Sequence, residues 1–206
     1  MSGPKKSEMF RELIQSRRSV REYEEDKEIE QEVLDSILDD CKWAPSWCNT
    51  HPYVICIARG SKVARIKAKL CANFDSISEA TATGDMSKIV KPNGDYRTNI
   101  KYDSELQKRR VDCAKGLYDL VGIERNDKIA RTAQDRRNLE CFDCTTVAFI
   151  FVQGDMGPFS PLDAGICLDT LLLSAHAHGI GACAQGVLAT WGVPIREEFN
   201  VPDGYK

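Results

Sequence analysis

Three short stretches of this 206-residue sequence hold the residue types that could do chemistry. The first, RRSVR, places Arg17, Arg18 and Arg21 within five residues and adds Ser19. Arginine presents a fork of N–H donors that matches phosphate oxygens, and the serine hydroxyl adds one more donor. The stretch therefore indicates either a local anion site or ordinary favourable charge at the end of a helix.

The second stretch, APSWCN, combines polar and aromatic side chains between a charged helical segment and an apolar strand. Ser46 and Asn49 could hydrogen-bond to a ring, and the faces of Trp43 and Trp47 could cover it. A planar heterocycle would match such a corner. The alternative is a well-packed loop in which Asn49 stabilises its own turn.

The third stretch, ACAQGV, places Gln185 and Gly186 in a β-compatible segment between apolar residues. Because glycine has no Cβ, its backbone can approach a ligand closely and offer its N–H as a donor. A β-bulge or a tight bend explains the pattern equally well. The sequence contains neither GxxxxGK[ST] nor GxGxxG.

Acid–base and metal-binding residue types form no clear catalytic pattern. His176 and His178 are two residues apart, so they lie on different sides of a helix, and we expect His176 to be a satisfied core or helix-end residue. Cys141 and Cys144 form a CxxC without a second pair at zinc-ligand spacing, which favours a structural role. The nine cysteines are odd in number and scattered, as is typical of reduced, buried thiols. Chemistry carried by a bound cofactor would explain this combination.

Length and charge exclude several classes of protein. The length fits one domain with its own core, so we expect a single domain over residues 1–206. A net charge of −3 provides no broad basic surface, which argues against a nucleic-acid partner. No apolar run reaches the roughly 18 residues needed to cross a membrane, and residues 1–10 lack a signal-peptide core. We therefore expect a cytoplasmic protein without a membrane partner.

Apolar periodicity predicts an irregular mixture of helices and strands. The helices are predicted from Ser7 to the RRSVR stretch, within VPIREEF, and over residues 28–42, 61–72, 104–121, 127–140 and 161–178. Residues 53–58 and 145–152 are rich in β-formers and predict two buried strands. Segment 161–178 is expected to be a central helix that is buried on nearly all sides. The mixture indicates the α+β class.

Three longer segments together resemble the nitroreductase family of flavoproteins in order and spacing. They are RRSVREY at 17–23, WAPSWCNTHPYVICIA at 43–58 and LDAGICLDTLLLSAHAHGIGACAQGV at 162–187. The resemblance implies a nitroreductase-like α+β fold, with a central, mostly antiparallel sheet flanked by helices, in a domain-sharing homodimer. It also implies FMN at the subunit interface. NADPH or NADH would reduce the flavin, and electrons would then pass through N5 to a nitroaromatic, a quinone or a similar small-molecule acceptor in a ping-pong cycle.

The resemblance assigns roles to residues by their position in these segments. The residues implied to contact the FMN phosphate, ribityl chain and pyrimidine edge are Arg17, Arg18, Ser19 and Arg21. Those implied to line the same flavin from the other subunit are Pro45, Ser46, Trp47 and Asn49. Gln185 and Gly186 would lie against the ring with a backbone N–H near N5, so neither a catalytic side chain nor a metal is expected.

The sequence also departs from the family pattern. The family loop commonly reads PSSxNxQPW, whereas Trp47, His51 and Tyr53 here replace its second Ser, its Gln and its Trp, which changes the polar contacts expected around the ring. Family chains usually continue past VPDGYK, so we expect this chain to lack the usual C-terminal strand and arm. Residues from about 85 to 125 resemble a substrate-covering insertion, and Tyr118 and Phe142 are expected to line the access route.

Three other functions are compatible with parts of the sequence. A flavin-dependent reductive dehalogenase of the iodotyrosine deiodinase type shares the arginine motif, although no distinctive substrate-clamping motif is evident at 85–125. A metal- or thiol-binding module would use Cys141, Cys144 and His176. A flavin-binding protein without turnover would bind FMN but consume no NAD(P)H. Halide release, metal content and NAD(P)H consumption would separate these functions.

Overall fold

A computed structural model describes residues 5–96 and 100–206, and the chain divides into two compact units. The first unit comprises Met1–Ile66, Phe142–Gln185 and Ile195–Lys206. The second unit comprises Lys67–Cys141 and Gly186–Pro194. Residues 97–99 of the predicted insertion lie outside the described residues. The single-domain assignment stays a prediction.

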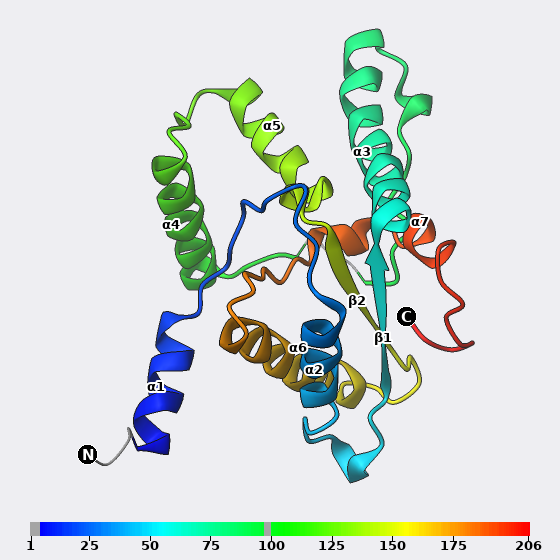
Figure 1. Cartoon of the computed structure of the whole chain (residues 1–206). Helices are drawn as coiled ribbons and strands as arrows, with labels where there is room; N and C mark the ends of the chain where they lie inside the picture. Colours follow the sequence, from blue (N-terminus) through cyan, green and yellow to red (C-terminus); the bar gives the residue numbers. More distant parts are fainter. Residues whose placement is uncertain (1–4, 97–99) are drawn as a thin grey trace. The chain divides into compact units, whose positions relative to one another are not determined.

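The centre of the first unit is an antiparallel pair of strands (Figure 1). Strand β1 (Tyr53–Arg59) pairs with β2 (Thr146–Val152), in a register that runs from Tyr53 opposite Val152 to Arg59 opposite Thr146. Both strands are rich in β-branched and aromatic residues, which suit a partly buried pleated surface. At the end of β2, Val152 and Lys206 exchange backbone hydrogen bonds of 2.8 and 2.7 Å. Both predicted strands are present, but most of their residues are only partly buried, so the expectation of two buried strands is confirmed in position and not in burial.

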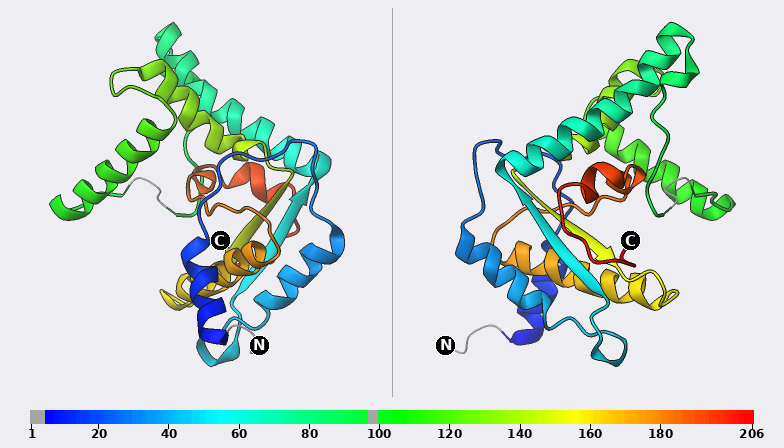
Figure 2. Two further views of the ribbon diagram at one scale, coloured as in Figure 1. Left: turned by 60° about the vertical axis from the view of Figure 1, so that its left-hand side comes forward. Right: turned by 90° about the vertical axis from the view of Figure 1, so that its right-hand side faces the viewer.

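Helices α2 (Gln31–Cys41) and α6 (Phe159–Ala177) pack against each other beside the strands (Figures 1 and 2). The buried residues of α2 recur at helical spacing, at Leu34, Ile37 and Cys41, so one face of the helix lies in the core. Helix α1 (Lys6–Ser16) also contacts α6. The short helix α7 (Val193–Arg196) falls within VPIREEF, where a helix was predicted.

The prediction that α6 is buried on nearly all sides is wrong. Its buried residues follow one face: Ser160, Asp163, Ala164, Cys167, Ser174 and Ala175. On another face, Leu162 is 62% exposed and Ile166 is 36% exposed. The reason is that α1, α2 and the two strands pack against α6 but leave the side chains of Leu162 and Ile166 open to solvent.

The second unit is helical. It contains most of α3 (Gly60–Thr83), α4 (Ser104–Leu120), α5 (Lys128–Leu139) and the 3-10 turns η2 (Met86–Lys88) and η4 (Val187–Thr190). Helix α3 extends beyond the predicted end at residue 72 and stops before Gly84, whose φ of +72° suits a helix terminus. Asp103 and Asp127 cap α4 and α5 by accepting hydrogen bonds from Leu106 N and Ala130 N. None of the helices within residues 5–96 and 100–206 is long and apolar enough to cross a membrane.

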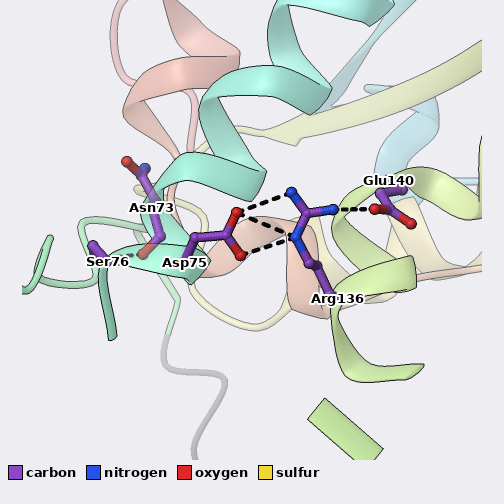
Figure 3. A network of polar contacts seen from close by, with 5 residues as sticks. All are labelled: Asn73, Asp75, Ser76, Arg136 and Glu140. Carbon is purple, nitrogen blue, oxygen red and sulfur yellow. Dashed lines mark hydrogen bonds and ion pairs between the residues drawn. The ribbon is translucent and has the colours of Figure 1, made fainter. Parts of the chain in front are cut away.

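Arg136 links α3 to α5 inside the second unit (Figure 3). Its Nε and Nη2 donate to the Asp75 carboxylate at 2.9 Å each, and its Nη1 donates to Glu140. Nearby, the Ser76 hydroxyl donates to Asn73 O at 2.6 Å. A fork-shaped pairing of this kind is stronger than a single-point ion pair, so Arg136 fixes the spacing of the two helices.

Replacing Arg136 with Met should lower the free energy of unfolding by about 1 kcal/mol, because the pair is half-exposed but two-pronged. In a chain of this size the melting temperature should then fall by about 2 to 4 °C. Thermal and urea unfolding measure the change. Arg109→Met is the matched control, since Arg109 pairs with Glu105 at 3.2 Å on the open surface of α4. Equal losses in the two variants would contradict the role given to Arg136.

Candidate functional site

The arginine stretch lies beside the segment that leads to Gln185. Arg17 follows α1, and its backbone N–H donates to Leu13 O at 3.3 Å. Ser19 forms a parallel bridge with Ala182, and Val20 N donates to Ala182 O at 3.1 Å. The fold thus brings together two of the three stretches that the sequence marked for chemistry.

Arg17 and Arg18 line a hollow of about 210 Å³. Its other lining residues are Val20, Leu172, His176 and residues 179–182. A Cβ added to Gly181 would lie 3.0 Å from the side chain of Val20, so the backbone there approaches the arginine stretch closely. A hollow of this size matches a phosphate and part of a sugar chain better than a whole cofactor.

Two histidines hold the C-terminal end of α6. His176 Nε2 lies 2.8 Å from Ser16 Oγ of α1, and His178 Nε2 lies 3.2 Å from Ser36 Oγ of α2. The expectation that His176 is a satisfied helix-end residue is confirmed. In the part of the chain that the structure describes, no group of three or more His, Cys, Asp or Glu side chains could hold a metal ion.

The aromatic corner is a tight loop with unusual backbone angles. The φ angles of Cys48, Asn49 and His51 are +51°, +55° and +44°, in the left-handed region that residues other than glycine seldom adopt. Hydrogen bonds within the loop hold this conformation: His51 N donates to Ser46 Oγ at 2.9 Å, and Thr50 Oγ1 donates to Trp47 O at 2.8 Å. Backbone strain that is held in this way is common at binding sites.

Two of the departures from the family pattern contact each other. His51 Nδ1 lies 3.0 Å from the Tyr53 hydroxyl, and His51 Nε2 lies 3.0 Å from Asn49 Oδ1. Asn49 therefore helps to stabilise its own turn, as the packed-loop interpretation expects. Trp47 stays 56% exposed and stacks on Phe159 at a ring distance of 4.6 Å, so its aromatic face borders the solvent.

Asp163 anchors the corner to α6. Its Oδ2 accepts a hydrogen bond of 3.0 Å from Trp47 N, and the residue is only 4% exposed. A buried carboxylate needs such a partner, because leaving it unpaired in the interior is costly. Sequence reasoning missed this residue, although a single acid in the apolar run PLDAGICL was a usable signal.

The corner and the arginine stretch contact opposite ends of α6. The corner contacts Phe159 and Asp163, whereas the arginine hollow is lined by Leu172 and His176. At roughly 1.5 Å per residue, Asp163 and His176 are about 20 Å apart along the helix axis. Figure 1 shows α1 near one end of α6 and the loop after α2 toward the other. One copy of the chain does not bring these two groups together.

Gln185 carries a buried acceptor. Its Oε1 is shielded from solvent and has no hydrogen-bond partner among the described residues. Leaving such an atom unpaired costs about 1 to 3 kcal/mol, so a ligand N–H group at this position would stabilise it. Gly186 comes next and precedes η4, and its carbonyl accepts from Ala189 N at 3.2 Å. The β-compatible segment forms a bridge at Ala182 but no strand over residues 180–187.

The two residues expected to line the access route have different environments. The ring of Tyr118, on α4, lies 5.3 Å from the Arg131 guanidinium. Burial raises the pKa of Asp135, and its hydrogen bond with Tyr118 acts in the opposite direction. Phe142 is 1% exposed and has a φ of +51°, within a left-handed turn over Cys141–Asp143. Both lining roles stay predictions.

A pair of cysteines lies in the core where α2 meets α6. Cys41 and Cys167 are buried together with Ala44, and Tyr53 and Leu171 pack against this cluster. The pKa of the Cys41 thiol is raised, first by its hydrogen bond with Cys167 and then by burial. Because both side chains are buried in this apolar cluster, they pack as small core residues.

Comparison with known proteins identifies the family. The model of the Nitroreductase family matches residues 14–206, so the chain belongs to the nitroreductase family. The nitroreductase NfnB of Mycolicibacterium smegmatis is 29% identical over 189 residues, which cover 92% of this chain and 75% of that protein. A 4-nitrobenzoate reductase from Nocardioides sp. is 25% identical over 196 residues, which cover 95% of this chain and 75% of that protein.

Solved structures agree with this assignment. The crystal structure of the FMN-dependent nitroreductase NfnB from Mycobacterium smegmatis in complex with NADPH has a TM-score of 0.79 and is 25% identical; the match covers 97% of this chain and 84% of that one. For the FMN and NADPH-dependent NfnB from Sphigopyxis sp. strain HMH, the TM-score is 0.82 at 24% identity, over 95% of this chain and 82% of that one. The predicted family and the nitroreductase-like α+β fold are confirmed.

Asp163→Ala should lower the free energy of unfolding by about 2 kcal/mol, because it leaves the Trp47 N–H without its charged acceptor. Amide hydrogen exchange at residues 46–51 should become faster, which mass spectrometry measures. Asp169→Ala on the exposed side of α6 is the control, and its exchange should match that of the unaltered protein. Unchanged exchange in Asp163→Ala would show that the carboxylate does not anchor the corner.

Proposed function

We propose that the chain is an FMN-dependent oxidoreductase that uses NADPH or NADH to reduce nitroaromatic, quinone or similar small-molecule acceptors. Membership of the nitroreductase family supports this function, as do relatives that are named nitroreductase and 4-nitrobenzoate reductase. The observation that carries the proposal is the pair Arg17 and Arg18 at a hollow beside the segment that leads to Gln185.

The residues of the first unit fit the phosphate end of FMN. A phosphate monoester carries about −1.5 to −2 charges near neutral pH. Arg17, Arg18 and Arg21 supply positive charge to hold it, and Ser19 supplies a hydroxyl. Among the residues that the structure describes, these three arginines have no carboxylate partner, so their donors are open to a ligand. The net charge of −3 makes this local cluster all the more necessary.

The ring end of the site would use the other marked residues. Gln185 Oε1 is a buried acceptor that a ligand N–H group would pair with. The Gly186 N–H would donate to the ring edge and stabilise negative charge there. When bound, FMN supplies the hydride chemistry. The chain's task is to hold the cofactor, orient donor and acceptor in turn, and exclude water.

We further propose that the working form is a homodimer. The corner and the arginine hollow lie at opposite ends of α6, so one flavin can contact both only if they come from two copies. In this arrangement Pro45, Ser46, Trp47 and Asn49 of one copy line the flavin held by the other. The exposed apolar side chains of α6, Leu162 and Ile166, are typical of a surface that another copy covers. A cytosolic location stays a prediction from the sequence.

The purified protein should show flavin absorbance between about 350 and 500 nm, or should gain it on addition of FMN. Arg17→Ala combined with Arg18→Ala should weaken FMN binding at least tenfold, because each lost charged contact removes about 1.5 kcal/mol or more. Fluorescence titration with FMN measures the affinity. Arg11→Ala, on exposed α1, is the control and should bind normally. Equal affinities in the double variant and the control would contradict the phosphate site.

Turnover separates the proposed function from its alternatives. Anaerobic NADPH or NADH should bleach the flavin bands, and a nitroaromatic or a quinone should restore them. Bound flavin that neither nucleotide reduces would instead identify a flavin-binding protein without turnover. Halide release from a halotyrosine would identify a reductive dehalogenase. Metal in place of flavin would favour the metal-binding module.

Two exposed cysteines provide a test of the corner. Cys48 lies in the corner and Cys113 lies on α4, and both are exposed. Saturation with FMN should slow the reaction of Cys48 with a thiol reagent several-fold, because the cofactor and the second copy cover the corner. Cys113 should react at the same rate with and without FMN. Mass spectrometry of labelled peptides measures both rates, and equal Cys48 rates would argue against a corner that lines the flavin.

A further inference from the structure

Within the second unit, a loop of the insertion is bonded to the segment that follows Gln185. We call residues 90–94, which follow η2, the 90–94 loop, and residues 186–194, which contain η4, the 186–194 segment. Asn93 N and Gly94 N both donate to Thr190 O at 3.1 Å. The Trp191 indole N–H donates to Val90 O at 3.1 Å.

A side-chain hydrogen bond adds to this contact. Val193 N donates to Asn93 Oδ1 at 3.1 Å, so Asn93 uses both its backbone and its side chain. These hydrogen bonds involve Thr190 before Trp191 and Val193 after it, and Trp191 itself is only 3% exposed. A segment that is bonded at several points in this way has little freedom to shift.

Gly94 contacts the backbone of η4 directly. A Cβ added at Gly94 would lie 1.7 Å from Ala189 O and 2.9 Å from Ala189 C. The obstacle is main chain and not a flexible side chain, so any larger residue at this position must push the two segments apart. The close approach therefore requires glycine at residue 94.

The contacted residue is joined to Gly186. Ala189 N donates to Gly186 O at 3.2 Å, in the turn that begins at Gly186. A larger residue at position 94 would displace Ala189, and it would therefore shift the turn that begins at Gly186. We propose that Asn93 and Gly94 are positioning residues that hold the Gly186 N–H in place for the flavin ring. This inference rests on the proposed function.

The consequence is specific to the flavin. A backbone N–H that is held at the ring edge stabilises negative charge on the reduced cofactor more than the oxidised one. A misplaced N–H would therefore lower the reduction potential of bound FMN and slow its reduction by NADPH. The phosphate end, which the arginine stretch holds, would keep most of the binding affinity.

The test compares Gly94→Ala and Asn93→Ala with the unaltered protein. Asn93→Ala removes only the acceptor for Val193 N, so it keeps the test informative if Gly94→Ala fails to fold. In both variants the affinity for reduced FMN should fall about tenfold relative to the affinity for oxidised FMN. For a two-electron couple this lowers the reduction potential of bound FMN by about 30 mV. NADPH should reduce the flavin about tenfold more slowly, with less than threefold change in the Kd for FMN. Gly116→Ala is the control, because a Cβ there meets nothing within 4 Å.

A second measurement needs no cofactor. Amide hydrogen exchange of residues 186–190 in the FMN-free chain should become faster in Asn93→Ala and Gly94→Ala but not in Gly116→Ala. Normal exchange and a normal potential in Asn93→Ala and in folded Gly94→Ala would overturn the positioning role alone. If the unaltered protein binds no FMN, the proposed function fails, and the positioning role fails with it.

Discussion

The packing of α6 on α2 through small side chains is the contact on which the first unit depends. Cys41, Ala44 and Cys167 form the buried cluster between the two helices, and Ser174 Oγ donates to Asp40 Oδ2 at 2.6 Å further along. Because the side chains at a helix contact set the distance between the axes, small residues permit a close approach. Helix α2 leads directly into the corner and α6 carries the carboxylate that anchors it, so this packing also places the corner.

Local sequence signals predicted most of the helices and strands but not their surroundings. Helices α4 and α5 have aspartate N-caps, both strands are rich in β-formers, and the structure places all four close to the predicted bounds. Helix α3 was predicted too short, because the polar run SEATAT gives little amphipathic signal. The burial of α6 was overestimated, because an apolar sequence does not reveal which of its faces the same chain covers. The segment after Gly179 suits a strand, but strand formation depends on a distant partner.

The site could be predicted from the sequence as residue types but not as contacts. The arginine stretch and the Gln185 segment were recognisable individually, and only the fold shows that Ser19 pairs with Ala182. The anchoring role of Asp163 and the bonds between the 90–94 loop and Thr190 join residues that are far apart in the sequence. Such pairings leave no local pattern, because they arise from tertiary packing. The resemblance to a family supplied the flavin, which no single motif specifies.

The left-handed turn over Cys141–Asp143 limits how this part of the chain can evolve. A left-handed backbone costs roughly 1 to 2 kcal/mol for each residue other than glycine, and three such residues follow one another here. Complete burial of the Phe142 ring offsets about 1.5 to 3 kcal/mol of this. Position 142 is therefore expected to stay large and apolar among descendants of this sequence, while glycine is the substitution most easily accepted at residue 143. Related sequences should therefore vary little at residue 142 and more often carry glycine at residue 143.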